Sequence, residues 1–197
     1  MTDTDPTTTR PPLDPRVERT RTVVLAATAR LLAADGFERI TIEAIAEASG
    51  VARSTIYRNW PTTADLLVEA FAVLVDKQAP PDLGSLRDDL EALGRELATG
   101  LSSTSWGRAL PSLISGAAHD PELARAQRAF SQARRAEIGD VFRRAAARGE
   151  IDELADPGEA AEAFAATFFF RALMTGQPLD EAFVARHVDR VIASVTS

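Results

Sequence analysis

Apolar residues in this chain recur every three to four positions, and no stretch shows the apolar-polar alternation of a β-strand. The clearest run is a leucine stripe at Leu86, Leu90, Leu93, Leu97 and Leu101. A helix places residues with this spacing on one face, which it can then bury. We therefore expect an all-α fold.

Glycine, proline and capping residues divide the chain into separate helices. Asp120 and Asp156 each precede a proline at a first helical position, and Gly36 has the place of a glycine that ends a helix. Pro111 predicts a short or kinked helix around it. The ranges expected to be helical are 16–35, 42–49, 52–60, 63–77, 85–101, 103–117, 121–148, 157–175 and 181–195. Residues 1–15, with few apolar side chains, are expected to form a disordered arm.

Several classes of site are excluded by composition. The chain has no cysteine, so it has no disulfide, thiolate metal site or cysteine nucleophile. Its two histidines, His119 and His187, lack metal-ligand spacing, and no nucleotide-binding or hydrolase motif occurs. No apolar run reaches the roughly 18 residues of a membrane span. We expect a cytoplasmic protein that is not an enzyme, with no membrane association, no cofactor and no metal.

The stretch from Gly36 to Leu67 predicts a helix-turn-helix unit. Thr41 is placed to cap a first short helix, and Gly50 suits the tight turn before a second. Ile42, Ile45, Ala46, Val51 and Ile56 would form its interior. The second helix would present a polar and basic outer face made of Arg53, Ser54, Thr55, Tyr57, Arg58 and Asn59. In such a unit the second helix enters the major groove of DNA.

The same stretch resembles the DNA-binding domain of tetracycline-repressor-type (TetR family) transcription regulators. The resemblance rests on Gly36-Phe37, Thr41, Ser49-Gly50-Val51, Thr55-Ile56-Tyr57, Trp60 and Leu66-Leu67. It implies that Thr41, Thr55 and Tyr57 contact phosphates and that Arg53 and Ser54 face base edges. Two positions depart from the family pattern, because Ala52 stands where a capping serine is common and Thr63 where a lysine is common.

The net charge of -7 is unevenly distributed along the chain. Residues 1–60 carry 8 basic and 8 acidic residues, whereas residues 61–197 carry 14 and 21. Positive charge exceeds negative only over residues 10–30. Arg10 in the arm is therefore a candidate for minor-groove contact, the alternative being a merely solvated arm.

Aromatic residues outside this unit have two interpretations, ligand contact or plain core. In the family the mid-chain helices enclose an effector, which implies a pocket formed by Phe71, Trp106, Leu110, Phe130 and Phe168. Trp60 is interpreted as a core residue rather than a base-stacking one. The resemblance also implies a dimer in which the last two helices pair with their symmetry mates through Ala161, Phe164, Ala165, Phe169, Val184 and Val188.

These observations predict a homodimeric, ligand-responsive repressor of a palindromic operator in double-stranded DNA. Residues 16–61 would bind DNA, and residues 62–197 would bind the small-molecule effector and dimerise. The alternative is a helical ligand-binding or adaptor protein that no longer recognises DNA.

Overall fold

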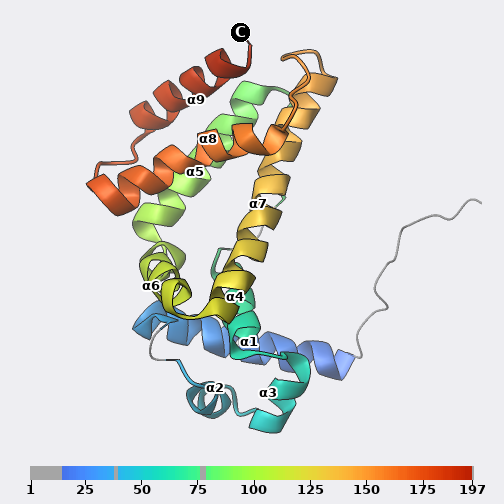
Figure 1. Cartoon of the computed structure of the whole chain (residues 1–197), viewed down its shortest axis with the longest axis vertical. Helices are drawn as coiled ribbons and strands as arrows, with labels where there is room; N and C mark the ends of the chain where they lie inside the picture. Colours follow the sequence, from blue (N-terminus) through green and yellow to red (C-terminus); the bar gives the residue numbers. More distant parts are fainter. Residues whose placement is uncertain (1–14, 38–39, 76–78, 197) are drawn as a thin grey trace, which may run out of the picture.

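The computed structural model describes residues 15–37, 40–75 and 79–196, which form helices and connecting segments and no strand (Figure 1). In chain order these are α1 (Pro15–Asp35), α2 (Ile42–Ser49), α3 (Arg53–Asn59), α4 (Thr63–Leu74), α5 (Leu86–Ser103), α6 (Ser105–His119), α7 (Pro121–Ala147), α8 (Pro157–Phe170), the π-helical turn η2 (Arg171–Thr175) and α9 (Glu181–Val195). The prediction of an all-α fold is confirmed.

The first three helices share a small core of their own. It consists of the buried residues Val24, Ile42, Ile45, Ile56, Trp60 and Leu66. The Thr41 hydroxyl caps α2 by accepting a hydrogen bond from the Ala44 amide at 3.2 Å. Gly50 ends α2 with a φ of 70°, a left-handed conformation that costs other residues free energy. The predicted interior and turn of the helix-turn-helix unit are therefore both present.

Helix α4 joins this unit to the rest of the molecule. Its Leu66 lies in the core of α1–α3, whereas Phe71 packs in a second core together with Phe37 and Trp106. The Thr62 hydroxyl accepts a hydrogen bond from the Asp65 amide at 3.1 Å and so caps the start of α4. Helix α4 thus contributes to two of the cores.

The other helices build the larger part of the fold around a third core. It consists mainly of residues from α5, α7, α8 and α9, among them Leu90, Phe142, Phe164, Phe168 and Val188. Figure 1 shows α8 and α9 at the end of the molecule opposite α2 and α3, with α7 running along its length. Asp120, Asp156 and Asp180 cap α7, α8 and α9, as their sequence positions predict.

Helix α6 differs from its prediction, because its 15 residues run through Pro111 without interruption. Gly107 allows this helix to approach α5 closely, since a Cβ there would lie 2.5 Å from the carbonyl oxygens of Gly100 and Leu101. Ser112 also contacts the end of α1, where its hydroxyl accepts a hydrogen bond from the Phe37 amide at 3.2 Å. A Cβ on Gly36 would lie 2.9 Å from the same hydroxyl oxygen. Helix α6 therefore contacts the segment between α1 and the helix-turn-helix directly.

A buried carboxylate fixes the segment before α5. Asp89 is fully buried, and its Oδ1 accepts a hydrogen bond from the Leu83 amide at 2.6 Å. Its Oδ2 lies 3.9 Å from Arg144 and 3.6 Å from Arg148, both on or just after α7. The carboxylate thus holds the connection between α4 and α5 against α7.

One further expectation differs from the structure at the end of an element, and two others concern residues outside the described ranges. The range expected as one helix over 157–175 is an α-helix to Phe170 followed by the π-turn η2. The predicted arm, residues 1–15, lies outside the described residues except for Pro15, as do positions 76–78 of the helix expected over 63–77.

Candidate functional site

The outer face of α3 is polar and accessible, while Ile56 and Trp60 hold the helix in the core behind it. Arg53, Ser54, Tyr57 and Arg58 are exposed, and Tyr57 is 55% exposed although it is aromatic. Thr41 is exposed at the start of α2, and Thr55 is half-buried. The structure therefore brings five of the predicted DNA-contacting side chains to one accessible surface. Arg10, the remaining basic candidate, lies outside the described residues.

Arg53 is held from the neighbouring helix. Its guanidinium donates a hydrogen bond to Glu43 Oε1 of α2 at 2.9 Å, and both side chains are largely exposed. This hydrogen bond, with a further one from the backbone of Glu43, lowers the pKa of the Glu43 carboxyl. To make a bidentate contact with guanine, this guanidinium would have to leave Glu43 or turn so that its other donors face the base. Glu43 is thus a direct partner of Arg53, and the sequence analysis did not identify it.

Asn59 is less available than predicted. Its side-chain amide donates to the Thr55 carbonyl within α3 at 2.9 Å, and its own carbonyl accepts from Arg21 at 3.3 Å. The residue is half-buried at the end of the helix. In this structure Asn59 therefore serves the packing of α3 against α1 rather than the exposed face.

A polar network ties the end of α3 to α1 and α4. Glu69 of α4 accepts a hydrogen bond from Trp60 Nε1 at 2.7 Å and one from Arg21 of α1 at 2.5 Å. The Arg21 guanidinium also lies over the Trp60 ring, 4.6 Å from its centroid, in a cation–π contact. Trp60 is 3% exposed, in agreement with its interpretation as a core residue. Arg21, counted among the basic residues of the arm and first helix, is therefore bound within the protein.

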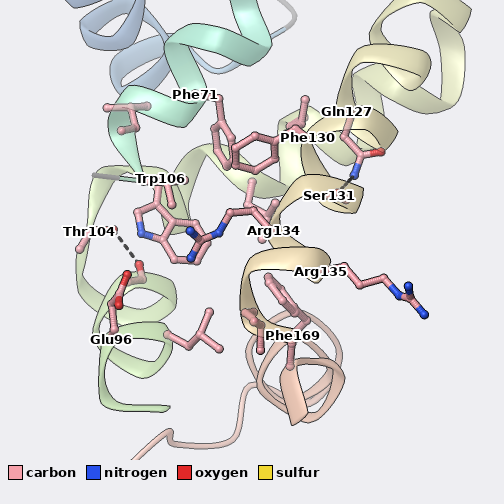
Figure 2. Close-up of a pocket in the computed structure, with 18 of the residues that line it drawn as sticks. Phe71, Glu96, Thr104, Trp106, Gln127, Phe130, Ser131, Arg134, Arg135 and Phe169 are labelled. Carbon is pink, nitrogen blue, oxygen red and sulfur yellow. Dashed lines mark hydrogen bonds between the residues drawn. The ribbon is translucent and has the colours of Figure 1, made fainter. Parts of the chain in front are cut away.

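A cavity of about 770 Å³ lies among α4, α5, α6, α7 and α8 (Figure 2). Phe71, Trp106, Leu110 and Phe130, all predicted pocket residues, line it. Phe71 meets Trp106 and Phe130 edge-on, with ring centroids 6.4 and 5.9 Å apart. This volume is within the range of cavities that hold small organic ligands.

Phe168 does not line the cavity, which corrects the prediction. Its ring is fully buried in the core of α5, α8 and α9, where it packs against Phe164 and Phe183. The next residue, Phe169, lines the cavity instead. Adjacent residues on a helix point about 100° apart, so the aromatic run did not reveal which ring faces inward.

Of the six residues expected at a dimer interface, four are buried in this chain's own core and the other two are half-buried. Phe164, Val184, Val188 and Ala161 are buried within this chain, and Ala161, Ala165 and Phe169 line the cavity. The outward faces of α8 and η2 carry other apolar residues, of which Phe170 is 58% and Met174 74% exposed. Ala163 and Ala166 are exposed beside them. The prediction thus selected the inward side of these helices, because the largest apolar residues pack first in the chain's own core.

Histidines and acidic residues do not form a metal site in the described part of the chain, where no group of three or more candidate ligands comes together. His119 ends α6 and is exposed, whereas His187 is buried between the rings of Phe164 and Phe183. Among the helices described, none is long and apolar enough to span a membrane.

Comparison with known proteins agrees with both parts of this architecture. Residues 24–70 match the family described as bacterial regulatory proteins, tetR family, and residues 80–191 match the tetracyclin repressor-like C-terminal domain. An HTH-type transcriptional regulator of Mycobacterium tuberculosis is 32% identical over 185 residues, which is 92% of this chain and 90% of the relative.

A further relative and a solved structure also match this chain over nearly its whole length. A DNA-binding transcriptional repressor TetR of Mycobacteroides abscessus is 30% identical, covering 90% of this chain and 94% of that protein. The crystal structure of the TetR family transcription regulator SCO0332 superposes with a TM-score of 0.77 at 32% identity, over 91% of this chain and all of that chain. A reading helix at one end, a cavity behind it and similarity along nearly the whole sequence lead to one conclusion: the chain belongs to the TetR family of DNA-binding, HTH-type transcriptional regulators.

Proposed function

We propose that this protein is a homodimeric repressor that leaves its operator when a small molecule occupies the cavity. The exposed face of α3 would enter the major groove, with Arg53 and Ser54 at base edges and Thr41, Thr55 and Tyr57 at phosphates. The similarity to a protein named as a DNA-binding transcriptional repressor supports the repressing sense.

One observation carries the proposal, namely that α4 contacts both sites. Its Phe71 forms part of the cavity wall, and its Glu69, two residues earlier, binds Trp60 at the end of the reading helix. A ligand that moves α4 by pushing on Phe71 would therefore also move Glu69, the hydrogen-bond acceptor of Trp60 at the end of α3. No separate relay element is needed, because both side chains belong to one helix.

Release by the effector would be a shift between two populations of the dimer. Reading heads about 34 Å apart match successive major grooves, and a movement of α4 in each subunit would change that spacing. The effector must favour the released form by several kcal/mol to empty the operator decisively. A palindromic operator follows from the two-fold symmetry of such a dimer.

The outward faces of α8 and α9 would form the dimer interface. Phe170, Met174, Ala163 and Ala166 supply exposed apolar and small side chains at the end of the molecule remote from α3. Sedimentation of the full chain should show a dimer, and the Phe170→Glu, Met174→Glu double variant should sediment as a monomer. Leu83→Glu, which alters an equally exposed apolar residue outside these helices, is the control and should remain dimeric.

The DNA-binding role is tested with sequences selected by the wild-type protein from a random DNA library. Arg53→Ala combined with Tyr57→Ala should weaken binding to the selected sequence by about tenfold or more, since a good base contact is itself worth that factor. Arg186→Ala, an exposed arginine on α9, is the matched control and should bind as wild type does. Unchanged affinity in the double variant at moderate salt would refute the assignment of α3 as the reading helix.

A further inference from the structure

The cavity is apolar at one end and carries a polar stripe along one side. Phe71, Trp106 and Phe130, from three different helices, form the end nearest the DNA-binding unit. On α7 the side chains of Gln127, Ser131 and Arg134 follow each other at helical spacing along the wall. Gln127 Nε2 donates to Ser131 Oγ at 2.9 Å. Ser131 is exposed and Gln127 half-buried, so the stripe runs from the solvent-facing edge of the wall to Arg134.

Arg134 is the most enclosed cation of the cavity. Its side chain is 17% exposed, and Figure 2 shows it reaching from α7 towards Trp106. Its hydrogen bond within the described chain is a single one, from Nη1 to Glu137 Oε2 at 2.7 Å. A guanidinium has five N–H donors in a rigid fork, so most of the donors of Arg134 have no acceptor among the described residues.

The other charged residues of the lining are all more exposed than Arg134: Arg95, Glu96, Arg135 and Glu162. Arg95 pairs with Glu91 and Glu181, and the hydrogen bond that it donates to Glu181 raises its pKa. Arg135 points away from the cavity in Figure 2 and pairs with Asp156 and Glu162. Glu162, an acidic group at the rim, therefore already has a cation. What distinguishes Arg134 is that it combines enclosure with unused donors.

We propose that the cavity binds an aromatic acid, with its ring system against Phe71, Trp106 and Phe130 and its anionic group on Arg134. The inference rests on the proposed function only in taking the cavity as the effector site. Aromatic walls favour offset or edge-to-face contact with a planar ligand. A charge-assisted hydrogen bond from arginine is strong enough to offset the desolvation of a carboxylate or sulfonate in an apolar cavity.

The same arrangement selects against other ligand classes. A cationic ligand would offer no acceptor to the N–H donors of Arg134, and the acids Glu137 and Glu162 are already paired with arginines. The remaining acid of the lining, Glu96, lies on the exposed side of α5. A neutral hydrocarbon of the same shape would displace water from the N–H donors of Arg134 without replacing it by an acceptor. Discrimination between an acid and its neutral analogue is thus the property that Arg134 should confer.

Two fluorescent dyes with the same ring system test this directly. 8-Anilinonaphthalene-1-sulfonate carries an anionic group that N-phenyl-1-naphthylamine lacks. Each is titrated into the full-length protein and its variants, and the dissociation constants are compared. In Arg134→Gln the anionic dye should bind about tenfold more weakly, as expected for a lost charge-assisted contact, while the neutral dye changes less than about twofold.

Three further variants make the result specific. Arg134→Met retains the aliphatic stem and should show the same selective loss, with neutral-dye binding reporting an intact cavity. Arg128→Gln removes an exposed arginine of the same helix and should change neither dye. Ala165→Phe fills space in the cavity wall and should weaken both dyes.

Several outcomes would overturn the proposal. One is an equal effect of both Arg134 variants on the two dyes, or no effect on either. Another is anionic-dye binding that Ala165→Phe leaves unchanged, because an aromatic anion would then prefer another surface to the cavity. DNA binding by the same proteins separates this inference from the function. If wild type binds DNA but the Arg134 variants affect both dyes equally, the ligand class alone is refuted. If the Arg134 variants selectively weaken the anionic dye but wild type does not bind DNA, the regulatory role alone is refuted.

Discussion

Replacing Glu69 by alanine should weaken the contact between α4 and the end of α3. The change removes the acceptor of the buried Trp60 N–H and the counter-ion of Arg21. A hydrogen bond to a charged acceptor contributes about 1.5 kcal/mol. The Arg21 pair contributes only about 0.5 kcal/mol, because its side chains are 22% and 38% exposed and water screens them.

The expected loss for Glu69→Ala is therefore about 2 kcal/mol in the free energy of unfolding. In a chain of 197 residues this corresponds to a fall in melting temperature of about 4–8 °C. Glu69→Gln keeps an acceptor for Trp60 and should lose only about 0.5 kcal/mol. The difference between the two variants isolates the Trp60 hydrogen bond.

Urea unfolding followed by far-ultraviolet circular dichroism measures these free energies, with Glu153→Ala, an exposed loop residue, as the control. The reasoning is refuted if Glu69→Ala unfolds within about 0.5 kcal/mol of wild type, since hydrogen bonds that strong would then be absent in solution. It is also refuted if alanine and glutamine have equal effects, because the Trp60 bond would then contribute nothing.

Four other results are expected. Ala52→Ser should stabilise the protein by about 1 kcal/mol in thermal denaturation, because Ala52 occupies the N-cap of α3 without a side-chain hydrogen bond. Asp89→Ala should lower the free energy of unfolding in urea by about 3 kcal/mol, since it leaves the Leu83 amide without its acceptor and Arg144 and Arg148 without a buried counter-ion. Burial lowers the pKa of His187, so the folded state holds its neutral form. The free energy of unfolding should then fall as pH decreases from about 6.5 towards the pKa of His187 in the folded protein. His187→Gln should abolish this fall, as measured by urea unfolding at each pH. Finally, the slope of log affinity against log salt should lie well below that for about ten neutralised phosphates per subunit, because Arg21 and Arg53 already pair with acids.

Local signals explain why most of the fold could be predicted from sequence. Asp120, Asp156 and Asp180 act within one helical turn, and the left-handed Gly50 needs no distant partner. The helix-turn-helix unit followed for the same reason. The interruption expected at Pro111 was wrong because close packing on α5 through Gly107 sustains the helix.

Tertiary contacts explain what the sequence did not reveal about the sites. Helix α8 is apolar on nearly every side, so periodicity did not distinguish its core face, its cavity face and its outer face, and Phe168 was misplaced. Glu69 meets Arg21 across 48 positions of sequence, which no local pattern encodes. The stripe of Gln127, Ser131 and Arg134 on α7 was detectable, since polar residues at three- and four-residue spacing share a face with Phe130.

The contact between Ser112 and the end of α1 limits how this protein can be re-engineered. The Phe37 amide donates to the Ser112 hydroxyl, and a Cβ on Gly36 would collide with that hydroxyl. The packing of α6 against the end of α1 therefore depends on residues from both. A chimera that exchanges the first 60 or so residues for those of a relative would carry one half of this contact and of the Arg21–Glu69 pair without the other. A chimera with a new DNA specificity therefore needs the relative's residues at positions 69 and 112 as well, in place of Glu69 and Ser112. Otherwise the exchange must be confined to the exposed face of α3.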